Sequence, residues 1–197
     1  IEKGRQTIAG MLRSNGYATG MVGKWHLGWD WPLKPGVTLP VKRSDRKHAT
    51  ELIDWTQAIN GGPVDCGFDY YWGEGVINIG PFTYIKNRHA LAAPIPGKSK
   101  KAKAKAPNWS DEKVLPDVTR EALSYIKSKA NQEKPFFLYF SLPSPHHPHV
   151  PAKQFQGKTK IGVYGDYIYQ TDWVVGEVMK AIKAAGISEN TLVIFTS

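Results

Sequence analysis

The sequence contains a single cysteine, Cys66, and this scarcity limits the disulfides and metal sites that the chain can form. One cysteine excludes an internal disulfide framework, and no cysteine or histidine partners stand at zinc-ligand spacing around it. We therefore interpret Cys66 as a packing residue. No apolar run reaches the roughly 18 residues of a transmembrane helix, and the first residues lack the apolar core of a signal peptide. The sequence therefore predicts no membrane partner and gives no compartment from a targeting segment.

Negative charge is also scarce, since 17 acidic residues against 26 basic ones give a net charge of +9. More than half of this excess comes from five lysines in one short stretch: Lys98, Lys100, Lys101, Lys103 and Lys105. Such a run among alanines is typical of a solvated loop, and steering of an anionic substrate is the alternative. We interpret the run as a surface loop and expect no nucleic-acid partner. The sequence gives no indication of an oligomeric state.

Helical spacing of apolar residues is followed three times by a short apolar run. Three such repeats predict an α/β fold, with a mainly parallel sheet flanked by helices. The expected helix and strand pairs are 6–15 with 17–22, a helix that starts at Pro116 and Asp117 with 136–140, and a third helix with 191–196. On the third helix the residues expected to share one face are Ile168, Val175, Val178, Met179 and Ile182.

Between Leu27 and Ser110 the chain is rich in Gly, Pro, Trp and Tyr, and hydrophobic periodicity is weak. A connection this long inside one domain is typical of a functional insertion that lines a pocket. We therefore predict a loop-rich insertion over 27–110, with short strands near 70–72 and 82–85. One domain is expected over 1–197, and both of its ends are expected to be truncations.

The segment from Gly16 to Gly28 contains two side chains that can bind an anion. If the strand runs from Ala18 to His26, Lys24 and His26 stand two residues apart and point to the same side, near the carboxyl end of the strand. Ligands bind at that end of open parallel sheets. An ammonium and an imidazole suit a tetrahedral oxyanion or an activated nucleophile. The alternative is an exposed lysine beside a hydrogen-bonded structural histidine.

Three histidines follow the apolar run 136–142 within four positions: His146, His147 and His149. The flanking prolines hold the loop extended and position its side chains at low entropic cost. Such a loop can bind an anion, and the alternative is a surface loop that is merely rich in histidine. Because His146 and His147 point apart in an extended chain, we predict no metal site here.

These segments resemble the type I, formylglycine-dependent sulfatases. Residues 16–28 match the second signature of that family, Gly-Tyr-x-Thr followed by Gly-Lys-Trp-His-Leu-Gly. The family also has Pro-His-x-Pro after an apolar strand, Tyr-Gly-Asp at the opening of a long helix, and a Val-Ile-Phe-Thr-Ser strand, which are matched at 145–148, 164–166 and 193–197. The resemblance covers nearly the entire chain and is strongest to bacterial arylsulfatase-like members. It implies a partial sulfatase catalytic domain over 1–197 with the alkaline-phosphatase-like fold, and a periplasmic or extracellular location.

The resemblance also implies roles for individual residues. Lys24 would contact the sulfate and the nucleophile, and His26 would hydrogen-bond the hydroxyl of the nucleophile. His146 would hold a sulfate oxygen or protonate the leaving alcohol, with His149 as the second choice for that role. Asn78 falls where family members often place a polar residue near the substrate, and the alternative is an ordinary turn asparagine.

Two parts of the family pattern are absent from the sequence. The family makes formylglycine from the first residue of Cys/Ser-x-Pro-x-Arg, but Gly-Phe-Asp follows Cys66, and the near match that begins at Ser141 has Pro145 in place of arginine. The carboxylates that bind Ca²⁺ in the family, an Asp pair and an Asp-Asn, are missing as well. We therefore expect the formylglycine and the calcium ligands to lie outside this chain, and we expect no turnover from residues 1–197 alone.

The activity implied for the complete protein is hydrolysis of a small-molecule or carbohydrate sulfate ester. One alternative is a phosphatase or phosphonate hydrolase of the same superfamily, which would use Thr or Ser as nucleophile and usually zinc-type ligands. The other is an inactive fragment that binds anions or glycans. Metal analysis and paired sulfate and phosphate ester assays separate these alternatives.

Overall fold

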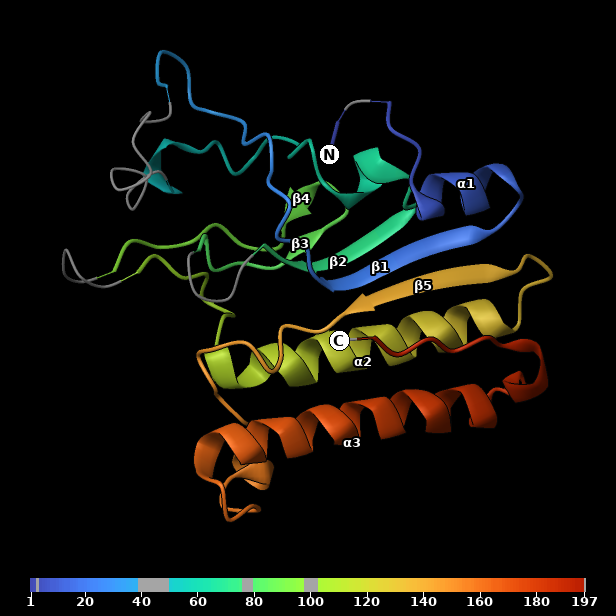
Figure 1. Ribbon diagram of the computed structural model, residues 1–197. Helices are drawn as coiled ribbons and strands as arrows, with labels where there is room; N and C mark the ends of the chain where they lie inside the picture. The colour runs from blue at the N-terminus through green and yellow to red at the C-terminus, as the bar shows by residue number, and fades with distance from the viewer. Residues whose placement is uncertain (3, 39–49, 76–79, 98–102, 197) are drawn as a thin grey trace.

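Five strands form one sheet in the order β4-β3-β2-β1-β5, with helices on both faces (Figure 1). The arrangement is that of a computed structural model, which describes residues 1–2, 4–38, 50–75, 80–97 and 103–196. The strands are β1 (Ala18–Lys24), β2 (Tyr70–Glu74), β3 (Ile85–Lys86), β4 (His89–Ala90) and β5 (Phe136–Ser141). The helices are α1 (Ile8–Ser14), α2 (Asp111–Ala130) and α3 (Gly162–Ala184), with 3-10 turns η2 (Pro63–Cys66), η3 (Lys153–Phe155) and η4 (Ser188–Asn190).

The central strand β1 pairs in parallel with β2 on one side and with β5 on the other. The two short strands β3 and β4 extend the β2 side in antiparallel pairs. The expected α/β fold with a mainly parallel sheet is therefore confirmed, and its short antiparallel edge makes the sheet mixed. None of the described helices is long and apolar enough to cross a membrane.

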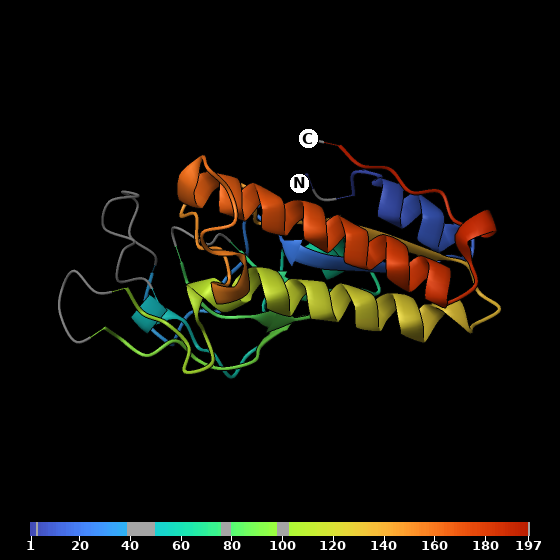
Figure 2. The same ribbon diagram turned by 90° about the horizontal axis from the view of Figure 1, so that it is seen from below.

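Successive residues of β1 and β2 point to opposite faces of the sheet. Met21 and Tyr71 belong to the buried cluster on the α1 face, whereas Val22 and Trp72 belong to the cluster on the α2 face. Helix α2 packs on β1, β2 and β5, and α3 lies alongside α2 (Figure 2). Burial on both faces explains why these strands are almost continuously apolar.

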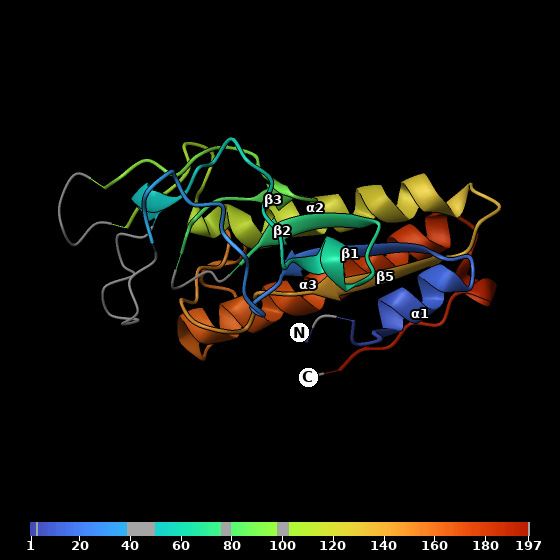
Figure 3. The ribbon, with the colours of Figure 1, turned by 90° about the horizontal axis from the view of Figure 1, so that it is seen from above.

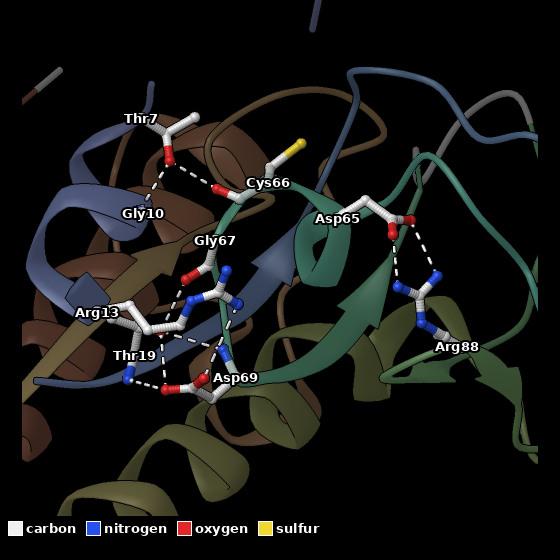
Figure 4. Close-up of polar contacts among 9 residues, drawn as sticks. All are labelled: Thr7, Gly10, Arg13, Thr19, Asp65, Cys66, Gly67, Asp69 and Arg88. Atoms are coloured by element: carbon white, nitrogen blue, oxygen red, sulfur yellow. Dashed lines mark hydrogen bonds and ion pairs between the residues drawn. The ribbon is translucent and has the colours of Figure 1, made fainter. Parts of the chain in front are cut away.

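Polar contacts tie the segment before β2 to β1 and α1 (Figure 4). The N–H of Thr19 donates to Oδ2 of Asp69 at 3.0 Å, and the N–H of Asp69 donates to Oγ1 of Thr19 at 3.0 Å. Thr7 Oγ1 donates to the carbonyl of Cys66 at 2.6 Å. Cys66 packs against the α1-face cluster, in agreement with its interpretation as a packing residue. Burial raises the pKa of its thiol.

The first predicted helix and strand are confirmed as α1 and β1, but the predicted start of the second helix is wrong. Helix α2 begins at Asp111, and Pro116 lies inside it. The Asp111 carboxylate accepts hydrogen bonds from Nζ of Lys105 at 2.8 Å and from Nε1 of Trp109 at 2.7 Å. These contacts, together with acidic residues in the first turn, stabilise a helix start well before the proline.

Helix α3 confirms the third predicted helix, but its buried face differs from the predicted one. The buried residues include Tyr167, Gln170, Val174 and Ile182, whereas Ile168 and Met179 are 37% and 46% exposed. The helix carries apolar residues around much of its circumference, so the side that packs is decided by its neighbours. One of these neighbours is the loop after β5, which hydrogen-bonds to Gln170.

The predicted buried strand over 191–196 is wrong. This segment belongs to none of the described strands, and Leu192 and Ile194 are 86% and 76% exposed. A strand requires a neighbour to bond with, and β5 forms the sheet edge without pairing with this run among the described residues. Apolar composition alone therefore did not determine its structure.

The stretch 27–110 contributes β2, β3 and β4 to the sheet. The strand expected near 70–72 is confirmed as β2. Near 82–85 the strand is shorter than expected, because Phe82 forms only an isolated bridge with Lys105. Of the lysine run, Lys98, Lys100 and Lys101 lie outside the described residues. Lys105 is not simply solvated, since its ammonium pairs with Asp111 and lies 5.6 Å from the Phe82 ring centroid.

Candidate functional site

The carboxyl ends of β1, β2 and β5 meet at one edge of the sheet. Gly23 is the register partner of Gly73 in β2 and of Ser141 in β5, so Lys24, Glu74 and the loop that follows Ser141 all leave the sheet together. The three strands lie side by side in the view from above (Figure 3). In open parallel sheets this edge is the usual position of a ligand site.

Glycines allow the strands to approach closely at this edge. Gly23 has a φ of +107°, and an added Cβ would lie 2.0 Å from the carbonyl oxygen of Ser141. A Cβ on Gly73 would lie 1.9 Å from the carbonyl oxygen of Gly23. The backbone beside Lys24 is therefore fixed by residues without side chains.

Lys24 is the last residue of β1 and is half-buried. Its register partner is Glu74, the last residue of β2. Trp72, which stands two positions before Glu74, belongs to the cluster under α2, so strand alternation places Glu74 on that face of β2. The charge of Lys24 lowers the pKa of the Glu74 carboxyl, so the two side chains lie near each other. The predicted anion-binding lysine thus has a neighbouring acid that the sequence did not reveal.

Glu74 is fully buried, and neither carboxylate oxygen has a hydrogen-bond partner among the described residues. Burial raises the pKa of its carboxyl to about 7, while the charge of Lys24 acts in the opposite direction. Tyr84 and Tyr167 lie close enough for the Glu74 charge to contribute to the raised pKa of both phenols, although burial is the main cause. Glu74 therefore lies between the sheet edge and α3.

The expectation that the strand continues to His26 is wrong. Strand β1 ends at Lys24, and His26 adopts a positive φ of 55°. Strand alternation therefore cannot place Lys24 and His26 on one side. The N–H groups of Trp25 and His26 still donate to the carbonyls of Glu74 and Gly75 at 2.9 and 3.0 Å, so the exposed His26 stays beside the end of β2.

The histidine loop begins next to Gly23, because Ser141 is its register partner. His146 and His147 are exposed and stack with ring centroids 4.4 Å apart. Nδ1 of His146 lies 2.6 Å from the carbonyl oxygen of His147. A carbonyl only accepts, so this nitrogen carries the proton and Nε2 remains available to a ligand.

His149 packs against α3 and not against His146. Its ring centroid lies 5.0 Å from that of Tyr164 and 6.2 Å from that of Tyr167. Two further hydrogen bonds hold the loop to α3: Thr171 Oγ1 donates to Ser144 Oγ at 2.8 Å, and the N–H of Ala152 donates to Gln170 Oε1 at 2.9 Å. Tyr167 also faces Glu74, so the His149 ring lies near the end of β2.

Asp166, in the second turn of α3, holds the segment after η3. Its carboxylate accepts the N–H groups of Gly157, Lys158 and Thr159 at 2.7–2.9 Å. Burial opposes ionisation, but these hydrogen bonds outweigh it and lower the pKa of the Asp166 carboxyl. This carboxylate is therefore a structural anchor. Asn78, a predicted substrate-binding residue, lies outside the described residues.

Within the described part of the chain, no group of three or more His, Cys, Asp or Glu side chains could hold a metal ion. These residues alone do not fit a calcium site. An open depression of about 430 Å³ lies at the opposite, amino end of β1 and β2, between Tyr70, Tyr125 and Lys134. The charged groups discussed above lie at the carboxyl edge instead.

Comparison with known proteins gives one consistent family. The sequence model described as "Sulfatase" matches residues 1–197. The chain is 30% identical over 233 residues to N-acetylgalactosamine-6-O-sulfatase of Bacteroides thetaiotaomicron, which covers 97% of the chain and 42% of that relative. It is 30% identical over 205 residues to human arylsulfatase A, which covers 97% of the chain and 34% of that relative. The chain thus spans less than half the length of these curated relatives.

Solved structures agree with the sequence relatives. A Bacteroides thetaiotaomicron structure from work on the metabolism of multiple glycosaminoglycans has a TM-score of 0.76 at 27% identity, and covers 97% of this chain and 44% of that one. PsFucS1 sulfatase from Pseudoalteromonas sp. has a TM-score of 0.62 at 20% identity, with coverage of 97% and 39%, and this likeness shows the fold.

Proposed function

The chain belongs to the sulfatase family, and from this premise we propose that the whole protein hydrolyses a sulfate ester. The observation that carries the proposal is the position of Lys24, at the carboxyl edge between the ends of β2 and β5 and next to the origin of the histidine loop. Sulfate ester cleavage keeps negative charge on the sulfuryl oxygens and builds it on the leaving oxygen. Fixed cations and donors aimed at both positions therefore lower the barrier.

Each predicted residue has a role in this proposal. Lys24 binds the sulfate, and His26 hydrogen-bonds the nucleophile. His146 in its doubly protonated form, in which Nε2 also carries a hydrogen, donates to a sulfate oxygen or protonates the leaving alcohol, and His149 is the alternative for that task. Asn78 contacts the substrate. Contacts with Tyr164 and Tyr167 hold the His149 ring against α3, close to the end of β2, and this position favours a binding role for His149.

Sulfatase family membership implies Ca²⁺ and formylglycine in general. In our proposal both depend on parts of the whole protein other than residues 1–197, because the sequence lacks the Cys/Ser-x-Pro-x-Arg motif and the described residues contain no fitting cluster of carboxylates. The substrate class we propose is a sulfated carbohydrate, which the activities named for the N-acetylgalactosamine-6-sulfatase relatives support. A periplasmic or extracellular location belongs to the same proposal.

Hydrolysis of 4-nitrophenyl sulfate and 4-nitrophenyl phosphate by the whole protein tests this function. The sulfate ester should be the better substrate, and Lys24→Ala should lower kcat/KM for it by about 100-fold or more. Lys86→Ala, which removes an exposed lysine from β3, is the matched control and should retain normal activity. Near-normal turnover by Lys24→Ala, or a preference for the phosphate ester, would refute the proposal. Turnover by residues 1–197 alone would refute the assignment of the nucleophile to another part of the protein.

The two histidines are separated by their dependence on the leaving group. If His146 protonates the leaving alcohol, His146→Ala should slow esters of weakly acidic alcohols more than esters of acidic phenols. His149→Ala should then change KM without this dependence. The reverse result would assign the proton donor to His149.

A further inference from the structure

Glu74 is a buried acid that has no role in the reaction proposed above. Its side chain is fully buried, and both carboxylate oxygens lack hydrogen-bond partners in the part of the chain that the structure describes. Buried polar groups are almost always hydrogen-bonded, and a buried charge is retained only where an opposite charge compensates it. The groups that surround the Glu74 carboxyl should therefore explain why it is buried without a hydrogen-bond partner.

The charged and titratable groups around Glu74 come from every element packed against it. Lys24 on β1 is the cation that acts directly on its carboxyl. Tyr84, before β3, faces Glu74 and hydrogen-bonds to Asp117 of α2, which pairs in turn with Arg120. Tyr167 faces it from α3, with the ring of His149 beyond. On β2 itself, the hydroxyl of the buried Tyr71 donates to the backbone carbonyl of Glu74 at 3.1 Å, and burial together with the Glu74 charge raises the pKa of that phenol.

Among these groups, only Lys24 both faces Glu74 and carries a full positive charge that acts on it. No ion pair within 4.0 Å joins the two in the described residues, so the lysine is not held in a closed salt bridge and its ammonium is available to a ligand. The charge state of Glu74 nevertheless decides how much of that positive charge an arriving anion experiences.

We propose that Glu74 is a positioning residue that acts through Lys24, so that the site takes up a proton together with its sulfate anion. The proposal rests on the proposed function, because it assumes that the sulfate group binds at Lys24. The proton comes from the solvent and adds to a carboxylate oxygen of Glu74, which turns the pair from neutral to singly positive. No covalent bond of the ligand changes in this step.

The direction of the pH effect follows from the surroundings of Glu74. Burial raises the pKa of Glu74 to about 7, so the carboxyl is neutral below that pH and leaves the charge of Lys24 uncompensated. Above it the carboxylate offsets the lysine and repels the anion. A bound anion in turn favours the neutral carboxyl and raises its pKa further. Anion affinity should therefore fall, on the order of tenfold, as the pH rises from about 6 to about 8.5.

Calorimetric titration with sodium sulfate, in two buffers of different ionisation enthalpy, measures the protons taken up on binding. Between pH 7 and pH 8 the wild-type protein should take up about half a proton more than Glu74→Gln, in which a neutral amide of the same shape replaces the acid, because part of the carboxyl is already protonated before the anion binds. The control Glu121→Gln removes an acid from α2 beside Tyr70, at the other end of β2 and about 13 Å away along that strand. It should behave like the wild type. Equal proton uptake by wild type and Glu74→Gln would overturn the proposal.

A second measurement separates this proposal from the proposed function. The titration midpoint of the Glu74 carboxyl, followed by ¹³C NMR, should rise in Lys24→Met, because the lysine charge that favours the carboxylate is gone. If sulfate binds to none of the proteins, the proposed function fails. The coupling between the two residues is then decided by this midpoint, which supports it if it rises and contradicts it if it stays unchanged.

Discussion

Substitution of Gly23 by alanine should disrupt the sheet at the point where Lys24 is positioned. The new Cβ would lie 2.0 Å from the carbonyl oxygen of Ser141, where ordinary contacts begin at 3.4 Å, so β1 and β5 would have to separate by more than 1 Å. Overpacking of this kind costs about 1–3 kcal/mol. The positive φ of Gly23 adds about 1–2 kcal/mol for any residue with a Cβ. The expected loss in the free energy of unfolding is therefore about 2–5 kcal/mol.

Gly16→Ala is the matched control for this prediction. Gly16 has a similar φ of +91°, but an added Cβ would meet nothing within 4 Å, so only the backbone cost of about 1–2 kcal/mol should appear. Urea denaturation of both variants, with sulfate binding measured below the transition, separates the two contributions. Gly23→Ala should lose more stability than Gly16→Ala and should also weaken sulfate binding. Equal losses in stability would refute the close approach of β1 and β5 at Ser141.

Three further predictions concern buried polar groups. Glu74→Gln should become more stable than the wild type as the pH rises from about 4.5 to about 7. In this pH range the Glu74 carboxyl keeps its proton in the folded protein and loses it in the unfolded chain, so the wild type alone loses stability. Thermal denaturation at pH 8 should show a difference of about 3 kcal/mol in the free energy of unfolding. Asp166→Asn should destabilise the protein at neutral pH, and this difference should vanish as the wild-type carboxyl is protonated in acid, since the lowered pKa gives stability that is lost as the pH falls. Tyr125→Phe should be neutral or stabilising by about 1 kcal/mol, because the buried hydroxyl of Tyr125 has no hydrogen-bond partner among the described residues. Tyr84→Phe should instead destabilise the protein by about 1 kcal/mol, because the hydroxyl of Tyr84 donates to Asp117 at 2.9 Å.

Local sequence patterns predicted the parts of the fold that depend on local chemistry. The apolar run with its glycines located β1 and placed Lys24 at a carboxyl end, and proline-flanked histidines after β5 located the loop at the same edge. The start of α2 was missed because Pro116 reads as a first-turn residue, although the contacts of Asp111 with side chains earlier in the chain begin the helix before it.

Other features depended on tertiary contacts that no window of sequence contains. The buried side of α3 is chosen by the loop that binds Gln170. The apolar run 191–196 lacks a strand partner among the described residues. Glu74 follows three aromatic residues and a glycine in a segment without periodicity, and its burial appears only once α2 and α3 cover this face of β2. The sequence therefore predicted the cation of the candidate site but not the acid beside it.

The most direct test of the candidate site is an NMR titration of the protein with inorganic sulfate that follows the side-chain nitrogens of lysine and histidine. Sulfate bound at the carboxyl edge should shift Nζ of Lys24 and the imidazole nitrogens of His146 or His149, and Lys24→Ala should abolish the histidine shifts. Shifts confined to Lys103 and Lys105, or to Lys129 and Lys134 beside the depression at the amino end, with Lys24 unchanged, would contradict the account.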